Sequence, residues 1–185
     1  MLPLCRQHDS LLLIIDVQER LSSAMRKKPF KRLKTNAKKL IKSATELDVP
    51  IFHTEQYPKG LGATVKSLNK RLTAPQHYSE KTTFSCCGES SFQTAVQKTH
   101  KRQIIICGME SHVCVLQTAM ELQAQHYEVY VVEDAITARH KQCHRNAIER
   151  MRQQGIIITN TESVLFEWLR DAKHPSFKTV SGLLK

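Results

Sequence analysis

Three residues with reactive side chains each follow a short apolar or extended run of this sequence. Asp16 directly follows "LLLII", Lys81 follows "HYSE", and Cys114 comes seven residues after the end of "QIIIC" at Cys107. A thiol, a carboxylate and an ammonium that meet can perform nucleophilic catalysis, because the thiolate attacks while the carboxylate moves its proton. The spacing alone leaves the ordinary alternatives open: a cysteine that only packs, a surface lysine and an aspartate that caps a helix.

The stretch "CGMESHVCV", residues 107–115, places the second cysteine at the start of a helical pattern. Ser111 is a good helix N-cap, which puts Cys114 near the third helical position. Free backbone N–H groups and the positive end of the helix dipole would then face the thiol. This environment lowers the pKa of a thiol, so we expect Cys114 to be a reactive thiolate.

The elements that must position these residues follow from the apolar pattern. Strands are predicted at 11–15, 50–54, 103–107, 128–132 and 156–159, with a weaker one at 77–80. Helical patterns cover about 30–47, 89–99, 111–126, 140–154, 161–171 and 175–184. Continuous apolar strands that alternate with helices indicate parallel strands buried on both faces. We therefore expect a three-layer, doubly wound α/β fold.

Ligands of open parallel sheets bind beyond the carboxyl ends of the strands. The polar or functional residues predicted at these ends are Asp16, Thr54, Glu55, Gln56, Lys81, residues 108–114, Glu133, Asp134 and Asn160. The connection at 55–76 is the only long one, and loops of that length are often functional.

Composition fits one globular domain spanning residues 1–185, of which 41% are hydrophobic. No apolar stretch approaches the roughly 20 residues of a membrane helix, and the first ten residues do not resemble a signal peptide. The six cysteines contain no C-x-x-C pair, so we expect reduced thiols and no structural zinc. We expect an intracellular protein, most simply cytoplasmic, with a mitochondrial location left open and no membrane partner.

The net charge of +11 comes from one segment. Residues 20–42 contain ten Lys or Arg and no acidic residue, whereas the rest of the chain has 18 basic and 17 acidic residues. Apolar residues recur there at helical spacing, which predicts an amphipathic helix with a basic face over 26–42. That face is either a solvated surface or a contact for RNA or another polyanion. No aromatic residues alternate with the lysines, which weakens the case for base stacking.

Several motifs together resemble the isochorismatase-like cysteine hydrolases. They are "LLLIIDVQERL" at 11–21, "EKTTFSC" at 80–86 and "CGMESHVCVLQTA" at 107–119. Two further stretches, "TEQYPKGLG" at 54–62 and "SVLFEWLRDAKHPSFK" at 163–178, resemble the isochorismatase-domain-containing subfamily. The motifs span most of the chain in the order typical of the family.

The resemblance implies a six-stranded parallel sheet in the order 3-2-1-4-5-6, which agrees with the strand count above. It also implies a catalytic triad of Asp16, Lys81 and Cys114, and a cis peptide between Met109 and Glu110. The N–H groups of Glu110 and Cys114 would then stabilise an oxyanion. Residues expected to line the substrate pocket are Gln18, Thr54, Gln56, Phe84 and His112, with Phe84 as a core residue and Gln18 as a helix cap being the alternatives. A homo-oligomer, a dimer or larger, is implied as well.

Several residues depart from the family pattern, and these departures disfavour two activities found in the family. Nicotinamidases of this family hold a metal through one Asp and two His after the second strand, but residues 53–77 contain no Asp, and their two histidines are 24 positions apart. True isochorismatases cleave an enol ether and need no cysteine nucleophile, which disfavours that activity here. His140, Cys143 and His144 share a helical stretch with no acidic ligand nearby and with Arg139, Lys141 and Arg145 around them, which disfavours a metal site. No dinucleotide fingerprint exists, because "KGLG" has no third glycine. We expect neither a metal nor a cofactor.

Two functions remain. The first is a metal-independent cysteine hydrolase that cleaves a small, amide-type substrate through a thioester. The second is an RNA- or polyanion-binding protein that uses the basic helix at 26–42 on a catalytically idle hydrolase fold. Nuclease activity lacks support, because no carboxylate cluster for catalytic magnesium is evident. Cys86 and Cys87 are expected to be loop or packing residues, with a small chance of redox sensitivity.

Overall fold

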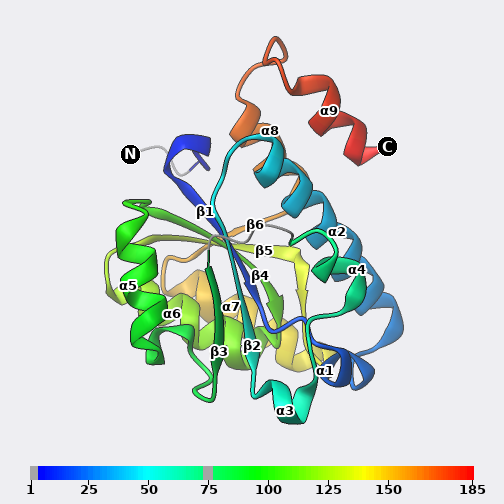
Figure 1. Ribbon diagram of the computed structural model, residues 1–185, viewed down its shortest axis with the longest axis vertical. Helices are drawn as coiled ribbons and strands as arrows, with labels where there is room; N and C mark the ends of the chain where they lie inside the picture. Colours follow the sequence, from blue (N-terminus) through cyan, green and yellow to red (C-terminus); the bar gives the residue numbers. More distant parts are fainter. Residues whose placement is uncertain (1–3, 73–76) are drawn as a thin grey trace.

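The computed structural model describes residues 4–72 and 77–185. A six-stranded parallel sheet in the order β3-β2-β1-β4-β5-β6 forms its centre (Figure 1). The strands are β1 (Ser10–Ile15), β2 (Ile51–Gln56), β3 (His77–Lys81), β4 (Gln103–Met109), β5 (Glu128–Thr137) and β6 (Ile157–Thr159). The predicted fold class and strand order are confirmed. Because all the strands run the same way, their carboxyl ends meet at one edge of the sheet, the lower edge in Figure 1.

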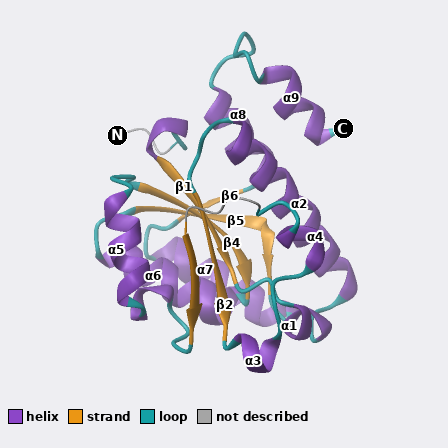
Figure 2. Ribbon diagram, in the orientation of Figure 1, coloured by secondary structure: helices purple, strands orange, loops and turns teal. Residues whose placement is uncertain are grey.

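Helices cover both faces of the sheet (Figure 2). The helix α2 (Lys27–Glu46) and α8 (Thr161–Leu169) pack on one face, where Leu33, Leu40 and Trp168 are buried. The other face carries α5 (Ser90–Lys98), α6 (Leu116–Ala124) and α7 (Lys141–Gln153). The central strands β1 and β4 are buried along their whole length between these layers, which explains their continuous apolar sequences.

The remaining elements are short. They are η1 (Gln7–Asp9), α1 (Glu19–Ser23), α3 (Pro58–Leu61), α4 (Lys66–Asn69), η2 (Cys86–Gly88), η3 (Ser111–Val115), α9 (Phe177–Ser181) and η4 (Gly182–Leu184). The long connection predicted at 55–76 therefore contains two short helices, and its residues 73–76 lie outside the described residues. Within the described part of the chain, no helix is both long and apolar enough to cross a membrane.

Several strands extend further than predicted, because main-chain pairing continues beyond the apolar runs. In β2, Gln56 still pairs with Lys81 of β3. The end of β4 pairs with the end of β5, Met109 opposite Thr137. Glu133 and Asp134 therefore lie inside β5, and the prediction that they follow that strand is wrong. The Asp134 carboxylate instead accepts hydrogen bonds from the backbone and hydroxyl of Thr161, at 2.9 and 2.8 Å, and so holds the start of α8.

Some helix ends also differ from their predicted positions. The helix α2 begins at Lys27 rather than near residue 30, with Pro29 in its first turn. A proline is tolerated there because the first N–H groups of a helix have no partner within the helix. The C-terminal helix is shorter than predicted, since α9 gives way to a 3-10 turn at Gly182.

Candidate active site

A buried ion pair joins the ends of β1 and β3. The Lys81 Nζ lies 2.7 Å from Asp16 Oδ2, and both side chains have no solvent exposure. Burial, the largest single influence, disfavours the ammonium, but negative charge on Asp16 and, in smaller part, on the Cys114 and Cys86 sulfurs together outweighs it, so the pKa of Lys81 is raised. The Nζ also reaches Gln56 Oε1 at 2.6 Å and the carbonyl oxygens of Thr83 and Phe84 at 3.3 and 3.0 Å. The three N–H groups of Lys81 are thus fully engaged by the protein.

A side chain of the neighbouring strand β2 holds the second oxygen of the Asp16 carboxylate. The Thr54 hydroxyl donates to Asp16 Oδ1 at 2.7 Å, because the pairing of Ile15 with Thr54 brings β2 beside it. Asp16 itself adopts a left-handed backbone conformation, with φ of 51°, which Asp tolerates better than most residues. Thr54 is only 1% exposed. It supports the carboxylate from behind rather than facing open solvent.

Gln18 and Gln56 brace the same region. The Gln18 Oε1 accepts from the Gln56 backbone N–H at 2.8 Å, and its Nε2 donates to the carbonyls of Gln56 and Gly62 at 3.0 and 2.6 Å. Gln56 Nε2 donates to the Thr82 carbonyl at 2.8 Å. Gln18 is fully buried and occupies the N-cap position of helix α1, but its side chain makes no capping bond there. Both amides hold the strand ends in place rather than lining an open pocket.

Cys114 lies in the π-helical turn η3, which connects β4 to α6. Its thiol is 5% exposed and lies close enough to Asp16 and Lys81 for both charges to act on it. Burial and then the charge of Asp16 raise the pKa of Cys114 to about 12, while Lys81 acts in the opposite direction. The thiol is therefore protonated at neutral pH, and the predicted resting thiolate is wrong. The helix dipole is too weak an influence here to overcome burial beside a carboxylate.

The start of η3 also differs from the prediction. Glu110, not Ser111, occupies the N-cap position, and no side chain makes a capping bond there. The Ser111 hydroxyl instead lies 2.9 Å from His144 Nδ1, so it ties the turn to α7. The Met109–Glu110 peptide is cis, as the resemblance implies. Arg139 donates from its backbone N–H and Nε to Glu110 Oε2 at 3.0 and 3.1 Å, which anchors the residue before the turn.

Gly108 lets β4 approach β1 just before this turn. Its φ is +129°, and a Cβ at this position would lie 2.1 Å from the Ile15 carbonyl oxygen. The register of β4 against β5 shifts between Ile106 and Gly108. Glycine is therefore required at this position of "CGMESHVC". Here Ile15, which precedes Asp16, meets the chain that leads to Cys114.

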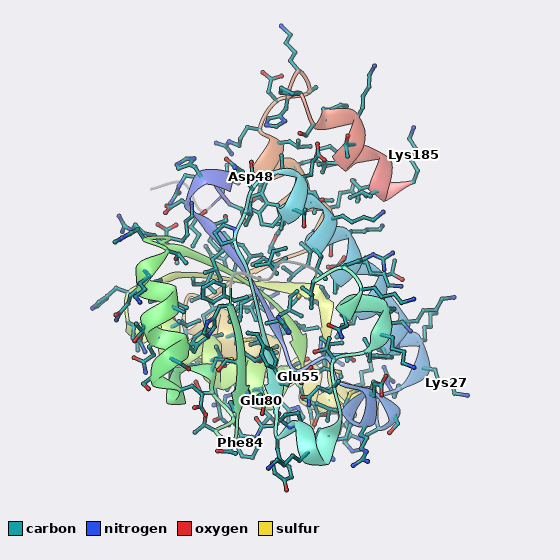
Figure 3. All side chains as sticks on the ribbon, viewed as in Figure 1. Lys27, Asp48, Glu55, Glu80, Phe84 and Lys185 are labelled. Carbon is teal, nitrogen blue, oxygen red and sulfur yellow. The ribbon has the colours of Figure 1, made fainter. Side chains whose placement is uncertain are left out.

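Lys81 borders a pocket of about 310 Å³ at the carboxyl edge of the sheet. Its lining comprises Tyr57, Pro58, Lys59, Glu80, Lys81, Thr82 and Glu89. Sequence reasoning named only Lys81 among these, although most of them follow the ends of β2 and β3. Phe84 is 55% exposed, so it is not a core residue, and it lies with Glu80 near the lower ends of the strands (Figure 3). His112 is partly exposed on η3, and its Nδ1 has no partner among the described residues.

A second thiol lies close to the ion pair. Cys86 is fully buried, its Sγ is 3.9 Å from Thr54 Oγ1, and burial raises its pKa to about 12. It packs behind Thr54, as expected for a packing cysteine. Within residues 4–72 and 77–185, no three His, Cys, Asp or Glu side chains are grouped so that they could hold a metal ion.

The fold and site define a doubly wound α/β protein with a buried thiol, carboxylate and ammonium at its strand ends. The family sequence model of the isochorismatase domain matches residues 10–163 of this chain. The chain is 37% identical to isochorismatase domain-containing protein 2 of Danio rerio over 175 residues, which cover 95% of this chain and 86% of the relative. The chain therefore belongs to the isochorismatase family, a family of hydrolases, as its motifs predict.

Solved structures agree with this assignment. The MAR1 ribonuclease of Caenorhabditis elegans superposes with a TM-score of 0.91 at 34% identity, covering 97% of this chain and 91% of that one. The YcaC gene product of Escherichia coli, described as an octameric hydrolase of unknown specificity, gives a TM-score of 0.90 at 26% identity. That match covers 97% of this chain and 90% of the other.

Proposed function

We propose that this protein is a metal-independent cysteine hydrolase that cleaves a small amide-type substrate. The observation that carries the proposal is the convergence of Cys114 and Lys81 on one buried carboxylate, Asp16. Such a site contains a nucleophile, a group to move its proton and a fixed positive charge. Membership of a hydrolase family supports the same class of chemistry.

In the first step, Asp16 removes the proton of Cys114 while the sulfur attacks the amide carbonyl carbon. A protonated resting thiol beside its base suits this coupled transfer, because the thiolate then forms only when a substrate is in place. The Lys81 ammonium balances the negative charge next to the sulfur. Gln56, Thr83 and Phe84 hold Lys81, so that it does not move toward the substrate.

The carbonyl π electrons move to oxygen, and the backbone N–H groups of Glu110 and Cys114 stabilise the resulting oxyanion. The intermediate then re-forms the carbonyl, the C–N bond breaks, and Asp16 returns the proton to the leaving amine. A thioester on Cys114 remains. Asp16 next takes a proton from water, the hydroxide attacks the thioester, and the acid leaves as Cys114 recovers the proton. Gln18, Thr54 and Gln56 act as positioning residues, while Phe84 and His112 face the substrate.

We also propose that the chain forms a homo-oligomer. The octameric state described for the similar E. coli structure supports this proposal. Large side chains exposed on the surface, Tyr57, Tyr78, Phe84 and Phe166, would be covered in part by such an assembly.

A panel of small primary and secondary amides tests the hydrolase, with release of amine as the readout. We expect turnover of at least one member by the unaltered protein and none by Cys114→Ala. Cys143→Ala is the matched control, because Cys143 is a partly exposed thiol on α7 outside the site. Intact-mass spectra should also show an acyl adduct that requires Cys114. Equal turnover by both variants, or an adduct on another residue, would reject the mechanism.

A further inference from the structure

The outer side of α2 carries a face rich in basic residues. Its members are Lys27, Lys28, Lys31, Arg32, Lys34, Lys38, Lys39 and Lys42. The opposite side of the helix, which includes Leu33, Ala37, Leu40 and Ile41, is buried in the core. At 100° per residue, the eight basic positions fill the arc that points away from these residues. The helix lies along the outer edge of the molecule, with Lys27 at its lower end (Figures 1 and 3).

The protein does not neutralise this face. Among the described residues, none of its eight basic side chains forms an ion pair with a carboxylate. Several of them repeat at i,i+4, such as Lys27 with Lys31 and Lys38 with Lys42, where like charges repel. Arg71, which follows α4, adds to this positive charge: burial and then the charges of Arg71 and Lys34 lower the pKa of Lys38. A bound polyanion would reduce the repulsion among these basic side chains, so the arrangement favours a complex with a polyanion over the free protein.

We infer that the basic face of α2 binds the phosphodiester backbone of double-stranded nucleic acid without reading its sequence. This interaction surface goes beyond the hydrolase proposed above and does not depend on it. A helix of this length measures about 30 Å, so it can lie along several successive phosphates of a duplex. Lysine is a compact positive charge suited to phosphate contacts, whereas base reading relies largely on planar bidentate groups. Seven of the eight basic residues are lysines.

Other polyanionic partners fit the face less well. A membrane-binding helix needs an apolar side to insert between lipids, but the apolar side of α2 is buried against the sheet. A protein interface needs large apolar or aromatic anchors at its centre, and the basic face offers none. A single strand needs exposed aromatic rings for stacking. The nearby ring of Phe30 is partly buried and lies under Lys34 Nζ, 5.3 Å from its centroid.

The test compares two triple variants of the full chain by fluorescence anisotropy with a 20-base-pair duplex of arbitrary sequence. The α2 variant is Lys28→Gln, Lys31→Gln and Lys42→Gln, three exposed positions on the face. The matched control, the α7 variant, is Arg145→Gln, Arg150→Gln and Arg152→Gln, which removes the same charge from exposed positions of another helix. Far-UV circular dichroism verifies that each variant keeps its helices.

We expect the unaltered protein and the α7 variant to bind the duplex alike, and the α2 variant to bind at least about tenfold more weakly in 50 mM salt. Its salt slope should become shallower by about 2.7, because each lost phosphate contact removes about 0.9. Separate titrations with an RNA duplex and a DNA duplex show which nucleic acid the face binds. Binding to either supports the inference. Equal losses in both variants, no binding by the unaltered protein, or stronger binding to phosphatidylserine vesicles would overturn it.

Discussion

At the Cys114 sulfur, burial and the Asp16 carboxylate act in the same direction, and together they raise the pKa of the thiol to about 12. Alkylation by iodoacetamide requires the thiolate. We therefore expect slow alkylation of Cys114 at neutral pH, with a rate that is still rising above pH 9. Peptide mass spectrometry across a pH series would measure this profile.

Replacing the carboxylate tests the cause of that shift. Asp16→Asn removes the negative charge and leaves the Lys81 ammonium near the sulfur, so the pKa of Cys114 should fall. Each unit of decrease raises the alkylation rate at pH 8 by about tenfold. The same variant should lose hydrolysis, because Asn cannot accept the proton. An unchanged alkylation profile would mean that burial alone sets the pKa.

The buried ion pair itself makes a prediction about stability. Lys81→Met leaves Asp16 without a partner in a fully buried site, which should lower the free energy of unfolding by about 3–5 kcal/mol. The double variant Asp16→Asn, Lys81→Met removes both charges, so it should recover part of that loss. Urea unfolding measures both values. If the double variant were as unstable as the single one, the cost would come from packing rather than from the unpaired charge.

Much of the site could be predicted at the residue scale, because Asp16 and Lys81 end strands and Cys114 follows one. The protonation state of the thiol could not, since it depends on how closely Asp16 approaches the sulfur in space. The roles of Gln18 and Gln56 were also hidden. Their partners are mostly main-chain groups of a neighbouring strand and of a distant loop, which no local pattern reveals.

Among the elements, β4 depends most on a single small residue. Gly108→Ala would place a methyl group 2.1 Å from the Ile15 carbonyl oxygen in a backbone conformation with φ of +129°. The combined clash and strain should lower the free energy of unfolding by about 2–5 kcal/mol. Gly182→Ala is the matched control, because a Cβ there has no neighbour within 4 Å. Similar urea midpoints for the two variants would show that β4 can move away from β1.

The centres of the elements could be predicted better than their ends. Continuous apolar sequence marks the buried middle of β1, β4 and β5, where both sheet faces are covered. Acidic residues near the ends of β2 and β5 make hydropathy place Glu55 and Glu133 in loops, although Glu55 still pairs with β3 and β5 pairs with β4 again from Ile136 onward. The π-helical form of η3 leaves no sequence signal either, because its first residues suit an ordinary N-cap.

For the whole molecule, sheet order determines which distant segments meet. Asp16 and Cys114 follow adjacent central strands, and Lys81 ends the edge strand β3 two positions away. Its long side chain reaches across β2, where Gln56 receives it at 2.6 Å. The same topology places α2 on the face opposite α7, although the charges of Arg32 and Arg26 near its start still act on His144 of α7. The catalytic edge of the sheet and the basic face of α2 therefore both follow from the order in which the strands and helices are connected.

Concentrated charge also makes a prediction for the stability of the whole molecule. Like charges at i,i+4 along α2 repel, and salt screens them. The α2 variant should therefore be more stable than the unaltered protein in 50 mM NaCl, by about 1 kcal/mol, and the gap should shrink in 500 mM NaCl. The α7 variant should gain nothing, because Arg145 and Arg152 flank Glu149 at favourable spacing. Urea unfolding at both salt concentrations measures these differences. If both variants gained equally at low salt, net charge rather than the basic face of α2 would be the source of the repulsion.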